Sequence, residues 1–282
     1  METEKELQER LEKLHEKLHG FYEAPWTLYH EPFHVAGPIY FVGNTYVSTY
    51  LIDTDQGLIL VDPGFKETQY LVFDSIRALG FDPHDIRHIF LSHGHVDHVG
   101  GTRYLQEYTK ANVWLGKDDL FFFTERPDLI IDEDHVPRFR IDCSYDYQQE
   151  FISQNIKIQF IHTPGHTPGV TTFLFKFYAN GHQMTAAMHG GLGLNGLTRL
   201  ELEKNRLPFT LQKAYIQGLQ ALMKIKVDIV LPSHNHNYDI LARYQAGHGT
   251  MEDFIDPTGW KNMLQDMLDK AKDVIPEAFD KL

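Results

Sequence analysis

The feature that most constrains this chain is the sequence SHGHVDH at residues 92–98, which contains three histidines and an aspartate within six residues. In extended backbone alternate side chains point the same way, so His93 and His95 can bind one metal ion. Asp97 and His98 follow as the chain turns into a helix, and they would supply a carboxylate oxygen and a further nitrogen at a neighbouring point. Four ligands of two types suit two adjacent metal ions, because a single zinc site needs only three protein ligands and a water.

Two later segments have the same local form as residues 92–98. The sequence TPGHTPG at 163–169 places His166 in a sharp turn directly after an apolar strand, where Pro and Gly fix the backbone. The sequence PSHNH at 232–236 places His234 directly after another short apolar strand. Loops at strand ends usually carry the chemistry of α/β proteins. Three strands that each deliver a histidine therefore favour a shared metal site over scattered surface histidines.

Strand and helix patterns alternate along the rest of the chain, which predicts an α/β layered fold rather than a helical bundle or a β-sandwich. Strands are expected at 38–47, 50–61, 88–91, 112–115, 156–162, 171–178, 184–188 and 228–231, and helices at 68–79, 99–109, 211–224 and 259–274. The segment 117–150 is expected to be a long mixed loop region.

Residues 1–22 are expected to form a helical extension in front of a single domain at 23–282. The apolar positions of this segment recur at helical spacing among Glu and Lys, and they are Leu7, Leu11, Leu14 and Leu18. The first interpretation is that this helix packs on the body of the protein. The alternative is a homodimer through paired N-terminal helices, although about two to three heptads are short for a coiled coil.

Charge and cysteine content exclude several classes of partner and site. In this chain of 282 residues, Asp and Glu number 39 and Lys and Arg 26, so the formal net charge of −13 disfavours nucleic acid and anionic membranes as partners. No apolar run has the length of a signal peptide or a membrane span, so a cytoplasmic location is expected. The single cysteine, Cys143, can form neither an intramolecular disulfide nor a Cys-based metal cage.

These motifs resemble the metallo-β-lactamase superfamily, whose signature is a His-x-His-x-Asp-His loop, a later Gly-His turn and a C-terminal His. The resemblance runs from about Pro32 to about Ala271 and includes the sequences PFHVAGPIYFVG, LILVDPG, ALGFDPHDIRHIFLSHGHVDHVGG, HTPGHTPGVTTF and FIDPTGW. Within the superfamily the flanks look most like the β-lactamase subclass whose second zinc is held by Asp-His-His, with no cysteine ligand.

The resemblance implies a four-layer αβ/βα sandwich with a dinuclear zinc site at the edge of two packed sheets. By position, one zinc ion would be held by His93, His95 and His166, and the other by Asp97, His98 and His234. In the family a hydroxide bridges the two ions, and Asp97 would also pass a proton to the leaving group. Imidazole and carboxylate ligands suit zinc, which lowers the pKa of bound water toward neutrality.

Asp62, at the end of the LILVDPG strand, matches a family position whose carboxylate orients a ligating histidine by accepting its free N–H. A turn-capping role before Pro63 and Gly64 is the alternative, and the two roles are compatible.

The chain departs from the family pattern at residues 185–193, where many hydrolases of the superfamily carry a metal-bridging aspartate. His189 lies in this neighbourhood, and a neutral imidazole cannot bridge two cations. His189 is therefore an extra terminal ligand, a substrate contact or a histidine at the mouth of the site. Gly190 and Gly191 replace a polar, Ser-containing segment of the β-lactamase relatives, and their backbone N–H groups can also bind a substrate carboxylate.

Other residues near the motifs are weaker candidates. His236 is expected at the mouth of the site or beside a ligand, and Tyr46 and Tyr238 are expected to contact substrate. Three consecutive Phe at 121–123 are expected in the core or in a dimer contact, in preference to a substrate wall. The remaining histidines near the motif strands are expected to be surface or packing residues, and they are His162, His182 and His248.

The expected function is a zinc-dependent hydrolase, β-lactamase-like, that opens an amide, lactam or ester-type acyl bond of a small molecule. A lactonase or thioesterase without lactam activity is an alternative. A non-haem iron oxidoreductase on the same fold is another, because iron accepts His and carboxylate ligands, although the chain leaves no room for a flavin domain. A binding protein with a structural metal site and a nuclease are the remaining possibilities, and the net charge disfavours the nuclease.

Overall fold

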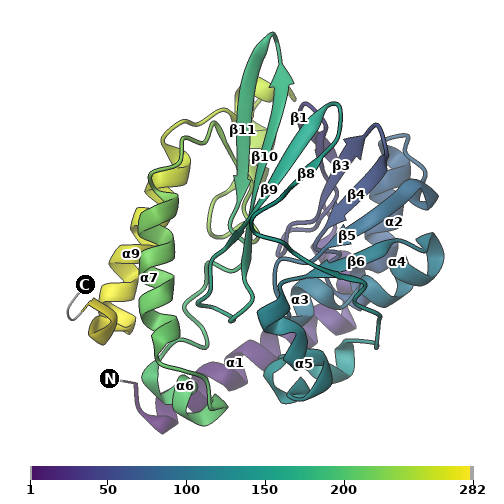
Figure 1. Ribbon diagram of the computed structural model, residues 1–282. Helices are drawn as coiled ribbons and strands as arrows, with labels where there is room; N and C mark the ends of the chain where they lie inside the picture. The colour runs from purple at the N-terminus through teal and green to yellow at the C-terminus, as the bar shows by residue number, and fades with distance from the viewer. Residues whose placement is uncertain (1, 280–282) are drawn as a thin grey trace.

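The computed structural model describes residues 2–279; Met1 and residues 280–282, the outer ends of the two units expected from the sequence, lie outside the described residues. Its first half forms a seven-stranded sheet in the order of the chain, with β1 (Phe33–Ala36), β2 (Ile39–Phe41), β3 (Tyr50–Thr54), β4 (Gly57–Val61), β5 (Ile86–Phe90), β6 (Asn112–Leu115) and β7 (Cys143–Ser144) (Figure 1). Strands β1 to β4 pair antiparallel, and β4 to β7 pair parallel.

The second half forms a five-stranded sheet in the order β12-β11-β10-β9-β8. Its strands are β8 (Glu150–Ile152), β9 (Ile156–His162), β10 (Thr171–Ala179), β11 (His182–Met188) and β12 (Ile229–Val230). All neighbours pair antiparallel except β11 and β12, which pair parallel.

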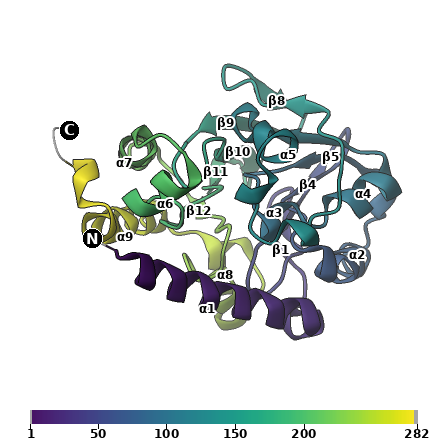
Figure 2. The same cartoon turned by 90° about the horizontal axis from the view of Figure 1, so that it is seen from below.

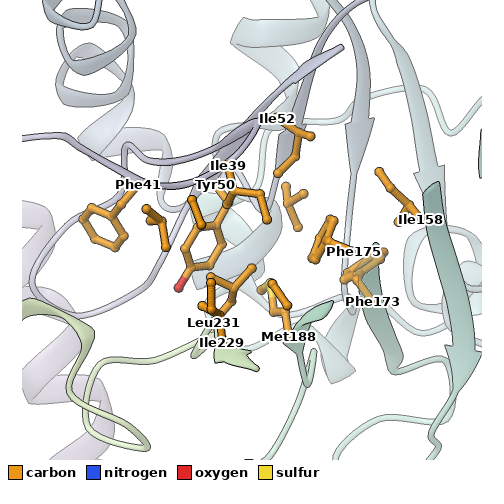
Figure 3. Close-up of a cluster of buried hydrophobic side chains, with 14 of the residues drawn as sticks. Ile39, Phe41, Tyr50, Ile52, Ile158, Phe173, Phe175, Met188, Ile229 and Leu231 are labelled. Atoms are coloured by element: carbon orange, nitrogen blue, oxygen red, sulfur yellow. The ribbon is translucent and has the colours of Figure 1, made fainter. Parts of the chain in front are cut away.

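The main core lies between the two sheets. Figure 3 shows Tyr50 and Ile52 from β3 on one side of this core, and Phe173 and Phe175 from β10 on the other. Leu174, between those two phenylalanines, belongs instead to the apolar cluster on the outer face of the same sheet. Strand β10 is therefore apolar on both faces because both faces are covered.

Helices cover the outer face of each sheet (Figure 1). One outer layer contains α2 (Gln69–Ala78) and α4 (Thr102–Thr109), and the other contains α7 (Thr210–Leu222) and α9 (Gly259–Val274). Separate buried clusters fill the space beneath the two layers. The predicted four-layer sandwich with an added N-terminal helix is confirmed.

Shorter elements connect the layers. The short α-helices are α3 (Val96–Val99), α5 (Leu120–Thr124), α6 (Arg199–Asn205) and α8 (Ile240–Ala246), and the 3₁₀ turns are η1 (Pro25–Leu28), η2 (Lys66–Thr68), η3 (Pro83–Asp85), η4 (Lys117–Asp119), η5 (Pro127–Leu129), η6 (Glu133–His135), η7 (Met251–Phe254) and η8 (Pro276–Phe279). The strand expected at 50–61 is a hairpin instead, because the chain turns at residues 55–56. The loop region expected at 117–150 contains α5, three of the 3₁₀ turns and β7.

Helix α1 (Glu4–Glu23) packs on the body of the protein, the first of the two interpretations considered. Leu18 is buried with Val47, Phe65 and Val96, so it is used within the chain. In the view from below, α1 runs across the molecule from the side of α9 to the side of α2 (Figure 2). The homodimer through this helix stays a prediction. Among residues 2–279 no helix combines the length and the apolar character that crossing a membrane requires.

Candidate metal centre

The six residues expected to bind metal meet at one edge of the sandwich. Two strands, β5 and β12, end directly before ligand segments, and the turn between β9 and β10 carries His166. The structure brings these residues together in two groups of three. One group contains His93, His95 and His166, the other Asp97, His98 and His234, and in each group the possible ligand atoms lie within 4.8 Å of one another.

The two groups are adjacent. In the first, His95 Nδ1 lies 3.0 Å from His166 Nε2. In the second, His234 Nε2 lies 3.2 Å from both His98 Nε2 and Asp97 Oδ2. The rings of His93 and His98, one from each group, have centroids 4.2 Å apart. Two neighbouring cations would therefore share this edge.

The chemistry of the first group fits a metal ion. His93 Nε2 is buried without a hydrogen-bond partner, although an unsatisfied buried nitrogen is costly. Burial, and then repulsion by the neighbouring histidines, holds the pKa of His93 well below 6.5. Burial also lowers the pKa of His166 to about 4. Neutral imidazoles that direct lone pairs at one point are a donor set for a cation such as zinc.

Asp97 gives the second group an anionic ligand. Burial disfavours its ionised form, but the charges of His98 and His234 outweigh burial and hold the pKa of Asp97 below its usual range. A carboxylate beside two imidazoles fits a second cation.

Asp62 is fully buried and holds one of the candidate ligands. Its Oδ2 lies 2.8 Å from His98 Nδ1, and its carboxylate also accepts the backbone N–H of Ser92 at 2.7 Å and the Ser92 hydroxyl at 2.6 Å. Because a carboxylate only accepts, His98 carries its proton on Nδ1 and keeps Nε2 free for a metal. The backbone of Asp62 is left-handed, with φ of 52°, so the residue also forms the turn before Pro63.

Asp119, which was not singled out from the sequence, joins the two histidine loops. It accepts the backbone N–H of Gly94 at 3.0 Å, the hydroxyl of Thr167 at 2.7 Å and the backbone N–H of Gly169 at 2.6 Å. Burial raises the pKa of Asp119 to about 6, and the three hydrogen bonds oppose that shift. Asp119 lies at the end of η4, inside the segment 117–150 that was expected to be a loop region. The composition of that segment gives no signal for the role of Asp119.

A cavity of about 260 Å³ opens over the two groups. It is lined by candidate metal ligands, among them His95 and Asp97, and by the segment 191–193. Leu14, Lys17 and Leu18 of α1 line the same cavity. A small molecule that enters this cavity therefore meets the two candidate metal sites and the N-terminal helix together.

Three of the proposed substrate contacts line this cavity, namely Tyr46, His236 and Gly191. Tyr238 is not among the described residues that line it; its hydroxyl donates to Asp256 at 3.0 Å. The carbonyl oxygen of Gly190 lies 3.1 Å from the hydroxyl oxygen of Ser92, and Gly190 does not line the described cavity either.

His189 is buried, and in the described structure it belongs to neither group of three. Its Nδ1 accepts the backbone N–H of Gly191 at 3.2 Å. Burial lowers the pKa of His189 to about 3, so this imidazole is neutral. That hydrogen bond also uses the Gly191 N–H, one of the donors considered for a substrate carboxylate.

Of the three phenylalanines at 121–123, Phe122 is buried in a small cluster with Leu129 and Ile130, as expected for a core contact. His162 is a packing residue: its ring stacks on Tyr147, with centroids 4.9 Å apart. His182 and His248 are exposed.

Comparison with known proteins gives a family match over part of the chain and a similar fold over about nine tenths of it. Residues 42–177 match the family model described as the metallo-beta-lactamase superfamily. BJP-1, a subclass B3 metallo-beta-lactamase of Bradyrhizobium japonicum, superimposes with a TM-score of 0.80 at 24% identity, over 90% of this chain and 96% of its own. A mutant of the metallo-beta-lactamase FEZ-1 from Legionella gormanii also gives 0.80, at 26% identity, over 89% of this chain and 97% of its own.

The names of curated relatives describe other activities. The hydroxyacylglutathione hydrolase GloC of Haemophilus influenzae is 24% identical over 155 residues, which are 54% of this chain and 71% of that protein. An N-acyl homoserine lactonase of Bacillus sp. is 25% identical over 168 residues, 47% of this chain and 59% of that protein. The chain thus spans less than two thirds of the length of the second relative. The same is true of the beta-lactamase-like protein 2 homolog of Drosophila melanogaster, matched over 58% of its length and 67% of this chain at 25% identity.

Proposed function

Since this chain belongs to the metallo-β-lactamase superfamily and is a metal-dependent hydrolase, we propose that it uses two zinc ions to open the acyl bond of a small molecule. The observation that carries the proposal is the pair of adjacent three-residue groups, each made of donors that suit zinc. Zinc bound there would lower the pKa of a water molecule toward neutrality and polarise the acyl oxygen.

The residues of the chain have separate parts in this proposal. His93, His95 and His166 would hold one ion, and Asp97, His98 and His234 the other. Asp62 keeps the proton of His98 on Nδ1, so that Nε2 stays available. Asp97, which lines the cavity and whose pKa is held below its usual range, would take up a proton on a carboxylate oxygen and pass it to the leaving group.

A β-lactam is the first substrate class proposed. The similarity to the two β-lactamases covers about nine tenths of this chain. A lactone or thioester is the second class, because the curated relatives are a hydroxyacylglutathione hydrolase and N-acyl homoserine lactonases. All three substrates present an acyl carbon to a nucleophile, so the same arrangement of residues serves each.

Metal content and turnover measured together test the proposal. The purified chain is analysed for bound elements, and it is then assayed with a chromogenic cephalosporin and a panel of small lactones and thioesters, with and without chelator. About two zinc ions per chain and chelator-sensitive hydrolysis of a member of the panel are expected. Bound iron without hydrolysis would contradict the proposal in favour of an oxidoreductase. Zinc that lacks an exchangeable water, with no turnover, would indicate a structural site.

A further inference from the structure

Helix α1 forms a fixed wall of the cavity, although it lies outside the segment 42–177 that matches the family model. Near its start, Arg10 Nη2 lies 2.7 Å from a carboxylate oxygen of Glu201 in α6. Near its end, the hydroxyl of Tyr22 donates to Asp132 at 3.0 Å. Contacts at both ends, together with the buried Leu18 between them, hold the cavity-facing side of α1 in place.

Lys17 brings a positive charge to this wall. Its Nζ lies 4.4 Å from the ring centroid of Tyr46, and that ring lies 5.1 Å from the ring of His234. The Lys17 ammonium and the His234 ring therefore lie beside the same aromatic ring, that of Tyr46. Apart from histidines, Lys17 and Asp97 are the charged residues among the described lining of the cavity, and Asp97 belongs to the candidate metal site.

The ammonium of Lys17 is available to a ligand. No ion pair involves Lys17 in the described part of the chain, where its ammonium lies over the rings of Tyr46 and Phe21. The positive charge of Lys17 is therefore not neutralised by an ion pair within residues 2–279.

Apolar side chains accompany this charge. Leu14, Ile131 and Leu192 line the same cavity as Lys17. The Gly191 N–H, which a carboxylate could have used, is donated to His189 instead. An occupant with an apolar body and one anionic end would match this lining, because the ammonium is the cationic donor beside the apolar wall.

We propose that Lys17 of α1 is a specificity-determining residue, which binds a carboxylate on the substrate away from the acyl bond that reacts. Tyr46 supports the ammonium with the face of its ring, and Leu14 contacts the apolar part of the substrate. The identity of the reacting bond rests on the proposed hydrolase function. Recognition of the carboxylate by Lys17 is a separate property, and a binding measurement detects it independently of hydrolysis.

The test compares two ligands that differ in one group, N-hexanoylglycine and its uncharged amide, N-hexanoylglycinamide. Their dissociation constants are measured by calorimetry on the full-length chain with its metal, at low and at high salt. The variants are Lys17→Gln, Lys17→Arg and, as a matched control, Lys5→Gln, which removes the same charge from the far end of α1. The ratio of the two dissociation constants is then compared between variants, which cancels any binding of the carboxylate to the metal, since that contribution is common to all variants.

The wild-type chain is expected to bind the acid roughly 3- to 10-fold more tightly than the amide at low salt, and less selectively at high salt. Lys17→Gln is expected to reduce this preference to the part that the metal contributes, while Lys17→Arg and Lys5→Gln keep it in full. Equal binding of the two ligands by the wild-type chain, or a preference in Lys17→Gln as large as in the wild-type chain, would overturn the proposal. Hydrolysis of the substrate panel, measured in parallel with and without chelator, reports on the proposed function separately.

Discussion

The carboxylate of Asp119 accepts the backbone N–H of Gly94 at 3.0 Å, at the point between His93 and His95 where the first candidate metal site begins. The same carboxylate also binds Thr167 and Gly169, on either side of the turn that follows His166. One buried side chain therefore sets the spacing of the two loops that supply the first group of ligands.

Replacing Asp119 by Asn should loosen that spacing. An amide has one accepting oxygen, so at least one of the three donors loses its partner inside the protein. We expect the free energy of unfolding to fall by about 1–3 kcal/mol and metal content to decrease. Denaturant unfolding and elemental analysis measure the two effects. The neighbouring Asp118→Asn, at a more exposed position, is the control, and equal behaviour of the two variants would refute this role.

The Asp62→Asn variant tests the orientation of His98. Asn tolerates the left-handed backbone at this position, so the turn is kept while the negative charge opposite Nδ1 is lost. We expect metal affinity or turnover to drop by about 10- to 100-fold, the usual effect of removing a group that orients a ligand. Asp74→Asn, at an exposed position of α2, removes the same charge elsewhere. Metal affinity and kcat unchanged by Asp62→Asn would show that His98 needs no partner.

His95 and His189 should respond differently to replacement by Ala. His95 belongs to the first group of three, so His95→Ala is expected to lose one metal ion and nearly all turnover. His189 accepts a hydrogen bond from Gly191 and is outside both groups in the described structure, so His189→Ala is expected to keep most of its metal. Elemental analysis measures how much metal each of the two variants retains. Loss of metal from His189→Ala would make His189 a ligand.

His88, in β5, should contribute to the pH dependence of stability. Burial lowers the pKa of His88 below 6.5, and its Nδ1 accepts the indole N–H of Trp114 at 3.1 Å. Below about pH 6.5 the unfolded chain therefore binds a proton that the folded chain does not, so stability falls as pH drops until the folded-state pKa is reached. His88→Asn keeps an accepting atom without a titrating ring.

The measurement is the unfolding free energy of both proteins between pH 7.5 and 5. The wild-type chain is expected to lose more unfolding free energy than His88→Asn over this interval, because only the wild-type chain carries the His88 imidazole whose pKa is lowered by folding. His182→Asn, which alters an exposed histidine, serves as the control. Parallel pH profiles for wild type and His88→Asn would exclude the effect.

Local sequence accounts well for the candidate ligands, because His93, His95, Asp97 and His98 lie within one strand-to-helix turn. It accounts less well for short elements. Helix α6 was missed although Thr198 and Glu201 form a capping box, a local signal that the sequence does contain. The contacts of Lys17 and Asp119 could not be read from the sequence, because they depend on segments distant along the chain. Asp119 and Thr167, for example, are separated by 48 residues.

The candidate ligands also lie far apart along the chain, so the ribosome adds them at different times. His95 and His166 are 71 residues apart, and His98 and His234 are 136 residues apart, yet each pair lies within 3.2 Å. A chain that is still being translated therefore lacks the second site until β12 and the residues after it have left the ribosome. Loading with metal would then be a late event that follows most of folding, and a prematurely terminated chain would carry an incomplete pair of sites.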